Sequence, residues 1–250
     1  MFAILCATVE EIAALRDRLD VEAQPQRLGP TRVWRGRYED EPLVLAQAGI
    51  GKVNAAAAAT LLLSAFGATR LIFCGVAGGL DPELPVGAVL LADRLAIHDY
   101  GVMAGGRLTS TASGLVPLGA PELEGLTPVS PGVRTTLERL AGILRAQVEG
   151  PVRLGGVVTA DYFLNCAETR SDLHARFAAQ AIDMESGAVN QVAEAWGVPL
   201  YVIRTLSDLA GEESHLTYPQ MAQMAAYNSA LCVLDLLAIL AEMDAPQTPP

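Results

Sequence analysis

The sequence is poor in the residues that metal, disulfide and nucleic-acid sites require. Its 250 residues include four cysteines and three histidines, with 17 basic against 28 acidic residues and a net charge of −11. The cysteines form no C-x-x-C pair and the histidines have no metal-ligand spacing, so we predict no metal and a reducing compartment. A chain this acidic, without a basic cluster, repels polyanions and lipid headgroups on average. We therefore expect a small-molecule partner, with no nucleic acid and no membrane.

Several cofactor and nucleophile motifs are also missing. The run Gly49-Ile-Gly51-Lys-Val-Asn54 lacks the early glycine and the Ser or Thr of a P-loop, and also the last glycine of G-x-G-x-x-G. No G-x-S-x-G elbow is present. The N-terminus lacks a basic leader, and the apolar runs at residues 55–65 and 230–240 are too short to span a bilayer. We predict a cytoplasmic protein without a cofactor.

The remaining composition and periodicity favour one α/β domain. Hydrophobic residues make up 51% of the chain, which is ample for a buried core. We expect the domain to span residues 1–243, with a disordered tail at 244–250 and a Gly/Pro/Ser/Thr-rich loop insertion at 101–131. Apolar and alternating runs predict strands at 2–7, 32–38, 43–48, 71–74, 86–92 and 152–159. Helical patterns cover 9–19, the Ala-rich run after Asn54, 133–144, 169–178 and 221–243, so that strand, glycine turn and helix repeat.

Carboxylates follow two apolar, strand-like runs. Glu185 comes after Ala181-Ile182, and Asp208 ends the run that begins at Tyr201. Open α/β sheets bind ligands at the carboxyl ends of their strands, so both acids are candidates for a site. A structural role is the alternative, because an acid at a helix N-terminus is stabilised by the free N–H groups there. The same alternative applies to Glu11, which follows the first strand.

Four short motifs follow one another along the chain: Gly49-Ile-Gly-Lys-Val53, Gly75-Val-Ala-Gly-Gly-Leu80, Asp183-Met-Glu185 and Arg204-Thr-Leu-Ser-Asp208. In this order and spacing they resemble the methylthioadenosine/S-adenosylhomocysteine nucleosidases of the purine nucleoside phosphorylase superfamily. The resemblance runs from the first strand to the last helix. It implies a single α/β domain in which helices flank a central mixed, partly barrel-like sheet. It also implies a homodimer that hydrolyses the N-glycosidic bond without a cofactor.

The resemblance also assigns catalytic roles. Asp208 matches the acid that protonates N7 of adenine, with Ser207 holding its carboxyl group, and burial should raise the pKa of such an acid. Glu11 matches the general base for the attacking water, and Arg204 matches the residue that organises this water and Glu185. Glu185 matches the carboxylate that accepts hydrogen bonds from the ribose hydroxyls.

The remaining substrate-binding positions follow from the same resemblance. Phe163 should stack on adenine while the backbone of Leu164 binds its edge. The other expected substrate-binding residues are Met184 beside the sugar, Ile50 and Tyr218 in the 5′ pocket, and Ala77, Gly78 and Asp183 of the motifs. Thr8 and Tyr218 make the 5′ pocket more polar than is usual in the family.

Three departures and alternatives bear on the reaction. Val76 stands where related phosphorylases place a phosphate-binding hydroxyl, which favours water as the nucleophile. The 101–131 segment looks longer than in compact relatives, and we expect it to reach the 5′ pocket of a neighbouring subunit. Other 5′-modified nucleosides are alternative substrates, namely futalosine, aminofutalosine and 5′-deoxyadenosine. A purine nucleoside phosphorylase and a non-catalytic nucleoside-binding relative are the remaining alternatives.

Overall fold

The computed structural model describes residues 1–211 and 213–244 of the chain. The strands are β1 (Phe2–Cys6), β2 (Asp20–Val21), β3 (Gln26–Leu28), β4 (Thr31–Tyr38), β5 (Glu41–Gln47), β6 (Arg70–Gly79), β7 (Val89–Ile97), β8 (Gly101–Ala104), β9 (Arg107–Ser110), β10 (Thr127–Pro128), β11 (Val152–Thr159), β12 (Ala179–Asp183) and β13 (Leu200–Asp208). The helices are α1 (Val9–Arg16), α2 (Lys52–Phe66), α3 (Pro131–Leu144), α4 (Ala167–Phe177), α5 (Ser186–Trp196) and α6 (Ser214–Asp244). Of the tail expected at 244–250, Asp244 is the last residue of α6 and the rest lies outside the described residues.

Five strands close into a barrel at the centre of the sheet. β6 pairs with β13, β13 with β7, β7 with β11, β11 with β12, and β12 pairs back with β6. The β6–β12 and β7–β13 pairs are antiparallel and the other three are parallel. Beyond β6, the sheet continues as an open extension through β1, β5 and β4. This confirms the predicted single α/β domain with a mixed, partly barrel-like sheet.

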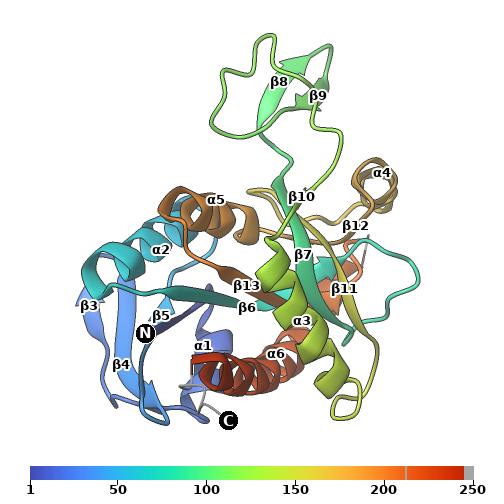
Figure 1. Cartoon of the computed structure of the whole chain (residues 1–250). Coiled ribbons are helices and arrows are strands. Elements are labelled where there is room, and N and C mark those ends of the chain that lie inside the picture. The colour runs from blue at the N-terminus through green and yellow to red at the C-terminus, as the bar shows by residue number, and fades with distance from the viewer. Residues whose placement is uncertain (212, 245–250) are drawn as a thin grey trace.

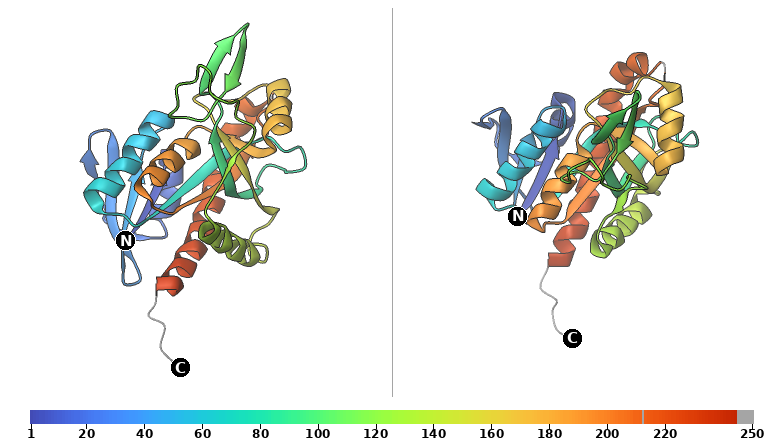
Figure 2. Two further views of the ribbon diagram at one scale, coloured as in Figure 1. Left: turned by 45° about the horizontal axis from the view of Figure 1, so that its top comes forward. Right: turned by 90° about the horizontal axis from the view of Figure 1, so that it is seen from above.

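Helices cover both faces of this sheet, as Figures 1 and 2 show. Side chains of a strand point alternately to opposite faces. In β1, Phe2, Ile4 and Cys6 belong to the core under α1, α3 and α6. Ala3 and Leu5 belong to the core under α2 and α5. The continuous apolar run of β1 is therefore a consequence of burial on both sides.

The last helix is longer than expected. We predicted a helix at 221–243 whose apolar stretch was too short to span a bilayer, whereas α6 begins at Ser214 and includes Pro219. Among the described residues, one segment, Thr217–Met243, is long and apolar enough to cross a membrane by length and composition. In this structure 56% of its most apolar window is buried, and α6 packs against β13, β6, α1 and α3. A buried core helix meets the same criteria.

Two other expectations were wrong in part. The run Gly75–Gly79 is the second half of β6 rather than a turn leading into a helix, because it stays paired with β13 and, at its end, with β12. The 101–131 segment is not a plain loop: β8 and β9 form a hairpin that projects from the body of the domain (Figure 1). Its turn is Gly105-Gly106, and both glycines have positive φ, as a tight hairpin turn requires.

Candidate active site

The predicted site residues surround a cavity of about 330 Å³ at the carboxyl ends of β1, β6, β12 and β13. Loops that follow β5 and β11 complete its wall. The volume is within the range of small-ligand pockets, and the position agrees with the ligand crevice of α/β sheets. The lining residues that sequence reasoning named are Thr8, Glu11, Ile50, Val76, Gly78, Phe163, Leu164, Asp183, Met184, Glu185, Ser207, Asp208 and Tyr218.

Glu11 is held at the cavity wall by backbone N–H groups. Its Oε2 accepts hydrogen bonds from the N–H groups of Ala7 at 2.9 Å and Thr8 at 3.0 Å, and its Oε1 accepts one from Val76 at 3.0 Å. The Thr8 hydroxyl accepts in return from the N–H of Glu11, which completes a capping box for α1. The structural role considered for Glu11 is therefore real, and the same bonds fix its carboxylate against the cavity.

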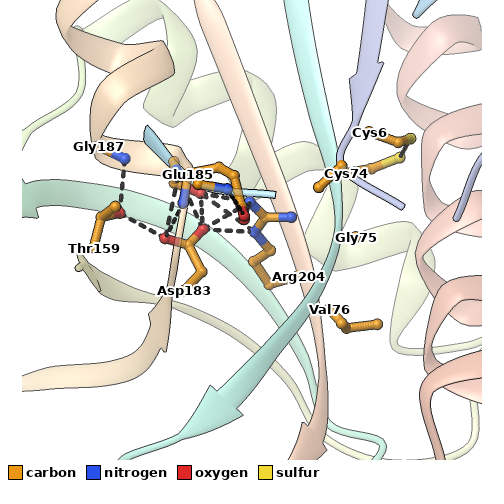
Figure 3. Close-up of polar contacts among 12 residues, drawn as sticks. Cys6, Cys74, Gly75, Val76, Thr159, Asp183, Glu185, Gly187 and Arg204 are labelled. Carbon is orange, nitrogen blue, oxygen red and sulfur yellow. Dashed lines mark hydrogen bonds and ion pairs between the residues drawn. The ribbon is translucent and has the colours of Figure 1, made fainter. Parts of the chain in front are cut away.

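Arg204 lies behind the cavity and is fully buried. Its guanidinium donates to Asp183 Oδ2, with Nη2 at 2.7 Å and Nε at 2.9 Å, and its Nη2 lies 3.8 Å from Glu185 Oε2 (Figure 3). Burial alone would lower the pKa of Arg204, but the charges of Asp183 and Glu185 outweigh burial and raise it. The guanidinium also stacks 4.0 Å from the centre of the Phe73 ring. Arg204 is therefore a fixed cation that orients two carboxylates.

Asp183 is saturated by protein donors. Besides Arg204, it accepts from the hydroxyl of Thr159 at 2.5 Å and from both the N–H and the hydroxyl of Ser186. Ser186 in turn accepts from Arg204. Although Asp183 borders the cavity, its bonds make it the support of Arg204 rather than a free acceptor for a ligand.

Glu185 reaches across the cavity to the glycine loop after β5. It occupies the N-cap position of α5, but its side chain makes no capping bond; Oε1 instead accepts the N–H of Gly51 at 2.9 Å. Burial, together with the charge of Asp183, raises the pKa of Glu185 to about 7, while Arg204 and the Gly51 N–H oppose that rise. This carboxylate is therefore exposed to the cavity and easily neutralised.

Gly75 keeps a space open between Glu11 and Arg204. A Cβ added at Gly75 would lie 2.2 Å from Glu11 Oε1 and 2.6 Å from Arg204 Nη1, so no side chain fits there. Nη1 is buried and has no hydrogen-bond partner among the described residues. A buried guanidinium N–H without an acceptor is costly, and a bound water beside Glu11 would satisfy it.

Asp208 ends β13 beside the same cavity and is 2% exposed. Burial raises its pKa, against hydrogen bonds from the Ala210 N–H at 2.8 Å and from the hydroxyls of Ser207 and Ser214. Ala210 has a positive φ of 49°, which costs an L residue some strain and aims its N–H at the carboxylate. The site thus holds a carboxyl group whose proton affinity is increased while its orientation is fixed.

The aromatic part of the wall comes from the loop after β11 and from α6. Phe163 is 46% exposed and meets the ring of Tyr218 edge to face at 5.7 Å. An aromatic ring this exposed beside a cavity offers a flat apolar surface to a planar ligand. Leu164 is buried next to it.

Two named residues do not line the cavity. Arg204 acts from behind the wall, as described, and Ala77 is buried with its carbonyl accepting from the Ser207 hydroxyl at 3.4 Å. Sequence reasoning missed the hydroxyls of Thr159 and Ser186, which fix Asp183, and Ser229, whose hydroxyl donates to the Gly75 carbonyl at 2.7 Å. Ser186 directly follows Asp183-Met-Glu185 at the start of a helical pattern, and that position was the one available signal for it. Within residues 1–211 and 213–244, no group of three or more His, Cys, Asp and Glu residues is arranged to hold a metal ion.

Comparisons with known proteins agree with this geometry. The model of the phosphorylase superfamily matches residues 1–238. The chain is 37% identical to the 5′-methylthioadenosine/S-adenosylhomocysteine nucleosidase of Mycobacterium bovis, covering 95% of this chain and 96% of that protein. It is 34% identical to the enzyme of the same name from Bacillus subtilis, covering 94% and 97%.

Solved structures give the same result. The Neisseria meningitidis nucleosidase in complex with methylthio-immucillin-A has a TM-score of 0.81 at 30% identity, covering 94% of this chain and 97% of that one. The futalosine hydrolase of Helicobacter pylori has a TM-score of 0.82 at 26% identity, covering 95% and 97%. The chain therefore belongs to the phosphorylase superfamily, among the 5′-methylthioadenosine/S-adenosylhomocysteine nucleosidases.

Proposed function

We propose that this protein hydrolyses the N-glycosidic bond of 5′-methylthioadenosine and S-adenosylhomocysteine, releasing adenine and the 5-thioribose product. The observation that carries the proposal is the convergence of Glu11, Glu185 and Asp208 on one cavity, with an exposed aromatic ring beside them. The names of the relatives support the same reaction. N-glycosidic hydrolysis needs an acid for the leaving base, an acceptor for the ribose hydroxyls and a base for water.

Asp208 supplies the acid. Adenine is a poor leaving group as an anion, and a proton delivered to N7 lets it depart neutral. A carboxyl group with a raised pKa carries this proton closer to neutral pH than an exposed aspartate does. Ser207 and Ala210 hold its two oxygens, which restricts the direction of transfer.

Glu185 binds the sugar. Its carboxylate faces the cavity next to Met184, and in the ionised form it accepts hydrogen bonds from the two ribose hydroxyls. Arg204, anchored on Asp183, keeps Glu185 in position from behind. As positive charge develops on the ribose ring, this anion stabilises it.

Glu11 and Arg204 prepare the attacking water. A water in the space over Gly75 would accept from the free Nη1 of Arg204 and donate to Oε1 of Glu11. When its oxygen attacks C1′ and the bond to adenine breaks, Glu11 accepts the released proton. Proton transfer by a positioned group of this kind contributes about 10² to 10⁴-fold to rate.

The same arrangement disfavours phosphate as the nucleophile. The N–H groups of Ala7, Thr8 and Val76 would form an anion-binding nest, but the carboxylate of Glu11 already occupies all three. Phosphate would meet this negative charge and the apolar side chain of Val76. Water is neutral and small enough for the space.

A second substrate class is favoured by the polar lining of the 5′ end. Thr8 and Tyr218 border the cavity and offer hydroxyl groups. The similarity to a futalosine hydrolase structure makes futalosine, aminofutalosine and 5′-deoxyadenosine the alternatives to compare. Relative kcat/KM values separate them.

We also infer a cytoplasmic homodimer. An apolar groove between α2 and α5 contains Val53 and Trp196, which are 79% and 49% exposed, and a second copy would cover it. The projecting β8–β9 hairpin carries no residue of its own subunit's cavity, which leaves it available for a partner's 5′ pocket. Sedimentation of the purified protein tests the dimer, and a purely monomeric protein contradicts it.

Adenine release from methylthioadenosine in phosphate-free buffer tests the proposed function. The wild type should release adenine, and Glu11→Gln should reduce kcat by about 10² to 10⁴-fold. No release from any of the 5′-modified nucleosides by the folded wild type would refute an enzymatic role and favour a nucleoside-binding protein.

A further inference from the structure

The only lysine of the sequence, Lys52, lies outside the proposed catalytic set but beside it. It is the first residue of α2 and directly follows Gly51, whose N–H binds Glu185. Its ammonium group forms ion pairs with Asp99, which follows β7, and with Asp161 at 3.6 Å, in the loop after β11. The side chains of Lys52 and Asp99 are 20% and 18% exposed, so water screens their pair only partly.

Backbone N–H groups connect the same three segments. The Lys52 N–H donates to Asp161 Oδ1 at 2.8 Å, and the Asp161 N–H donates to Asp99 Oδ2 at 2.8 Å. The two adjacent N–H groups of Gly51 and Lys52 therefore bind carboxylates from two sides, Glu185 of the site and Asp161 of the aromatic loop. Displacing this one peptide segment would disturb both.

Geometry at Gly51 shows how little room the segment has. Gly51 has a φ of 96°, a conformation that L side chains rarely adopt, and an added Cβ would lie 3.3 Å from Asp161 Oδ1. No side chain caps the N-terminus of α2. The Lys52 charge network is thus what fixes the loop end from outside the helix.

The segments joined by this network carry the residues that face the ligand. Ile50 precedes the lysine, and Tyr162, Phe163 and Leu164 follow Asp161; all four line the cavity. A second bond ties the aromatic loop to the end of β7, because the Tyr162 hydroxyl lies 2.8 Å from His98 Nε2. The sugar-binding carboxylate and the base-binding loop are consequently fastened to each other through Lys52.

We propose that Lys52, through Asp99 and Asp161, is a positioning residue that sets the relative placement of Glu185 and the Phe163 loop. The inference rests on the proposed nucleosidase function for its kinetic consequences and on the contacts alone for its structural ones. Displacement of catalytic groups by about 1 Å can cost about 10²-fold in rate. Lysine suits this role because one ammonium group serves two carboxylates.

The test compares Lys52→Met, Lys52→Arg and the isosteric Asp99→Asn with the wild type. Arg134→Met is the matched control, because Arg134 forms a partly exposed ion pair with Asp93 at 2.8 Å on α3, away from the cavity. We expect Lys52→Met to lower kcat/KM for methylthioadenosine by about 10²-fold. Asp99→Asn should show a smaller loss, Lys52→Arg should recover activity to within about tenfold of wild type, and Arg134→Met should lose none.

The pH profile distinguishes positioning from general destabilisation. Loss of the Gly51 N–H bond raises the pKa of Glu185, so the acid limb of kcat/KM should move to higher pH in Lys52→Met. The other charged groups that face Glu185, namely Asp183, Arg204 and Glu11, are unchanged in this variant. An unmoved acid limb together with kcat/KM within threefold of wild type would overturn the proposal.

Amide hydrogen exchange gives a result that does not depend on turnover. In Lys52→Met the amides of Gly51, Lys52 and Asp161 should exchange faster, while Arg134→Met leaves them at wild-type rates. Unchanged exchange at all three overturns the inference even if the wild type proves inactive. An inactive wild type with the expected exchange pattern refutes only the proposed function.

Discussion

Glu185→Gln should make the protein more stable at alkaline pH while removing its activity. The reason is that Glu185 is buried beside Asp183, so its pKa rises from the ordinary value of 4.5 to about 7. A carboxyl group whose pKa is raised on folding contributes stability that is present below the unfolded pKa and lost as the pH rises through the folded pKa. The glutamine side chain is neutral at every pH and keeps an oxygen for the Gly51 N–H.

The size of this effect follows from the two pKa values. A tenfold change in proton affinity corresponds to about 1.4 kcal/mol, so ionising Glu185 in the folded protein costs about 3 kcal/mol at pH 8. At pH 5 the cost falls below about 1 kcal/mol, because the folded protein keeps the group protonated. Charges on Arg204 and Asp183 remain in the variant, so their mutual pairing does not change.

Urea unfolding of wild type and Glu185→Gln at pH 5 and pH 8, at one protein concentration, measures this difference. The free energy of unfolding of the variant should exceed that of the wild type by up to about 3 kcal/mol at pH 8, and the gap should narrow at pH 5. A variant that is no more stable than the wild type at pH 8 would refute the account of a carboxylate held at a cost in stability.

Three further substitutions test individual groups. Asp208→Asn keeps the shape and the Ala210 N–H bond but cannot donate the proton, so kcat should fall about 10² to 10⁴-fold; activity within a few-fold of wild type would reject it as the acid. Gly75→Ala places a methyl group 2.2 Å from Glu11 Oε1, so kcat should fall at least about 10²-fold in a protein that still folds, and retained turnover would argue against the water position. Phe163→Ala should raise KM for methylthioadenosine about tenfold through lost stacking, with little change in kcat; an unchanged KM would show that adenine binds elsewhere.

Much of the fold could be predicted because burial leaves a direct signal in the sequence. β11 has the predicted bounds, and the hairpin of β4 and β5 was predicted from two apolar runs around a charged turn. The glycine run of β6 could not be predicted from local pattern, since glycine there serves tertiary contacts: Gly75 makes room for Glu11 and Arg204, and Gly78 lies against Asp208. In the 101–131 segment, composition outweighed the Gly-Gly turn signal that marks the β8–β9 hairpin.

The site was predictable where chemistry and chain position coincide. Acids that end buried strands meet at one edge of a sheet, and this places Glu185 and Asp208 together. Which acid contacts a ligand could not be predicted from spacing. Asp183 and Glu185 are two residues apart, yet only the structure shows that the first is saturated by Arg204 and Ser186 while the second faces the cavity.

Identification of the sugar product tests the central claim, that water held by Glu11 is the nucleophile. Methylthioadenosine is incubated with the wild type in phosphate buffer, and the products are separated and identified by NMR. The account predicts adenine and free 5-methylthioribose, at a rate that does not depend on phosphate. Formation of 5-methylthioribose 1-phosphate would contradict it and show that the Glu11 carboxylate does not exclude phosphate from the cavity.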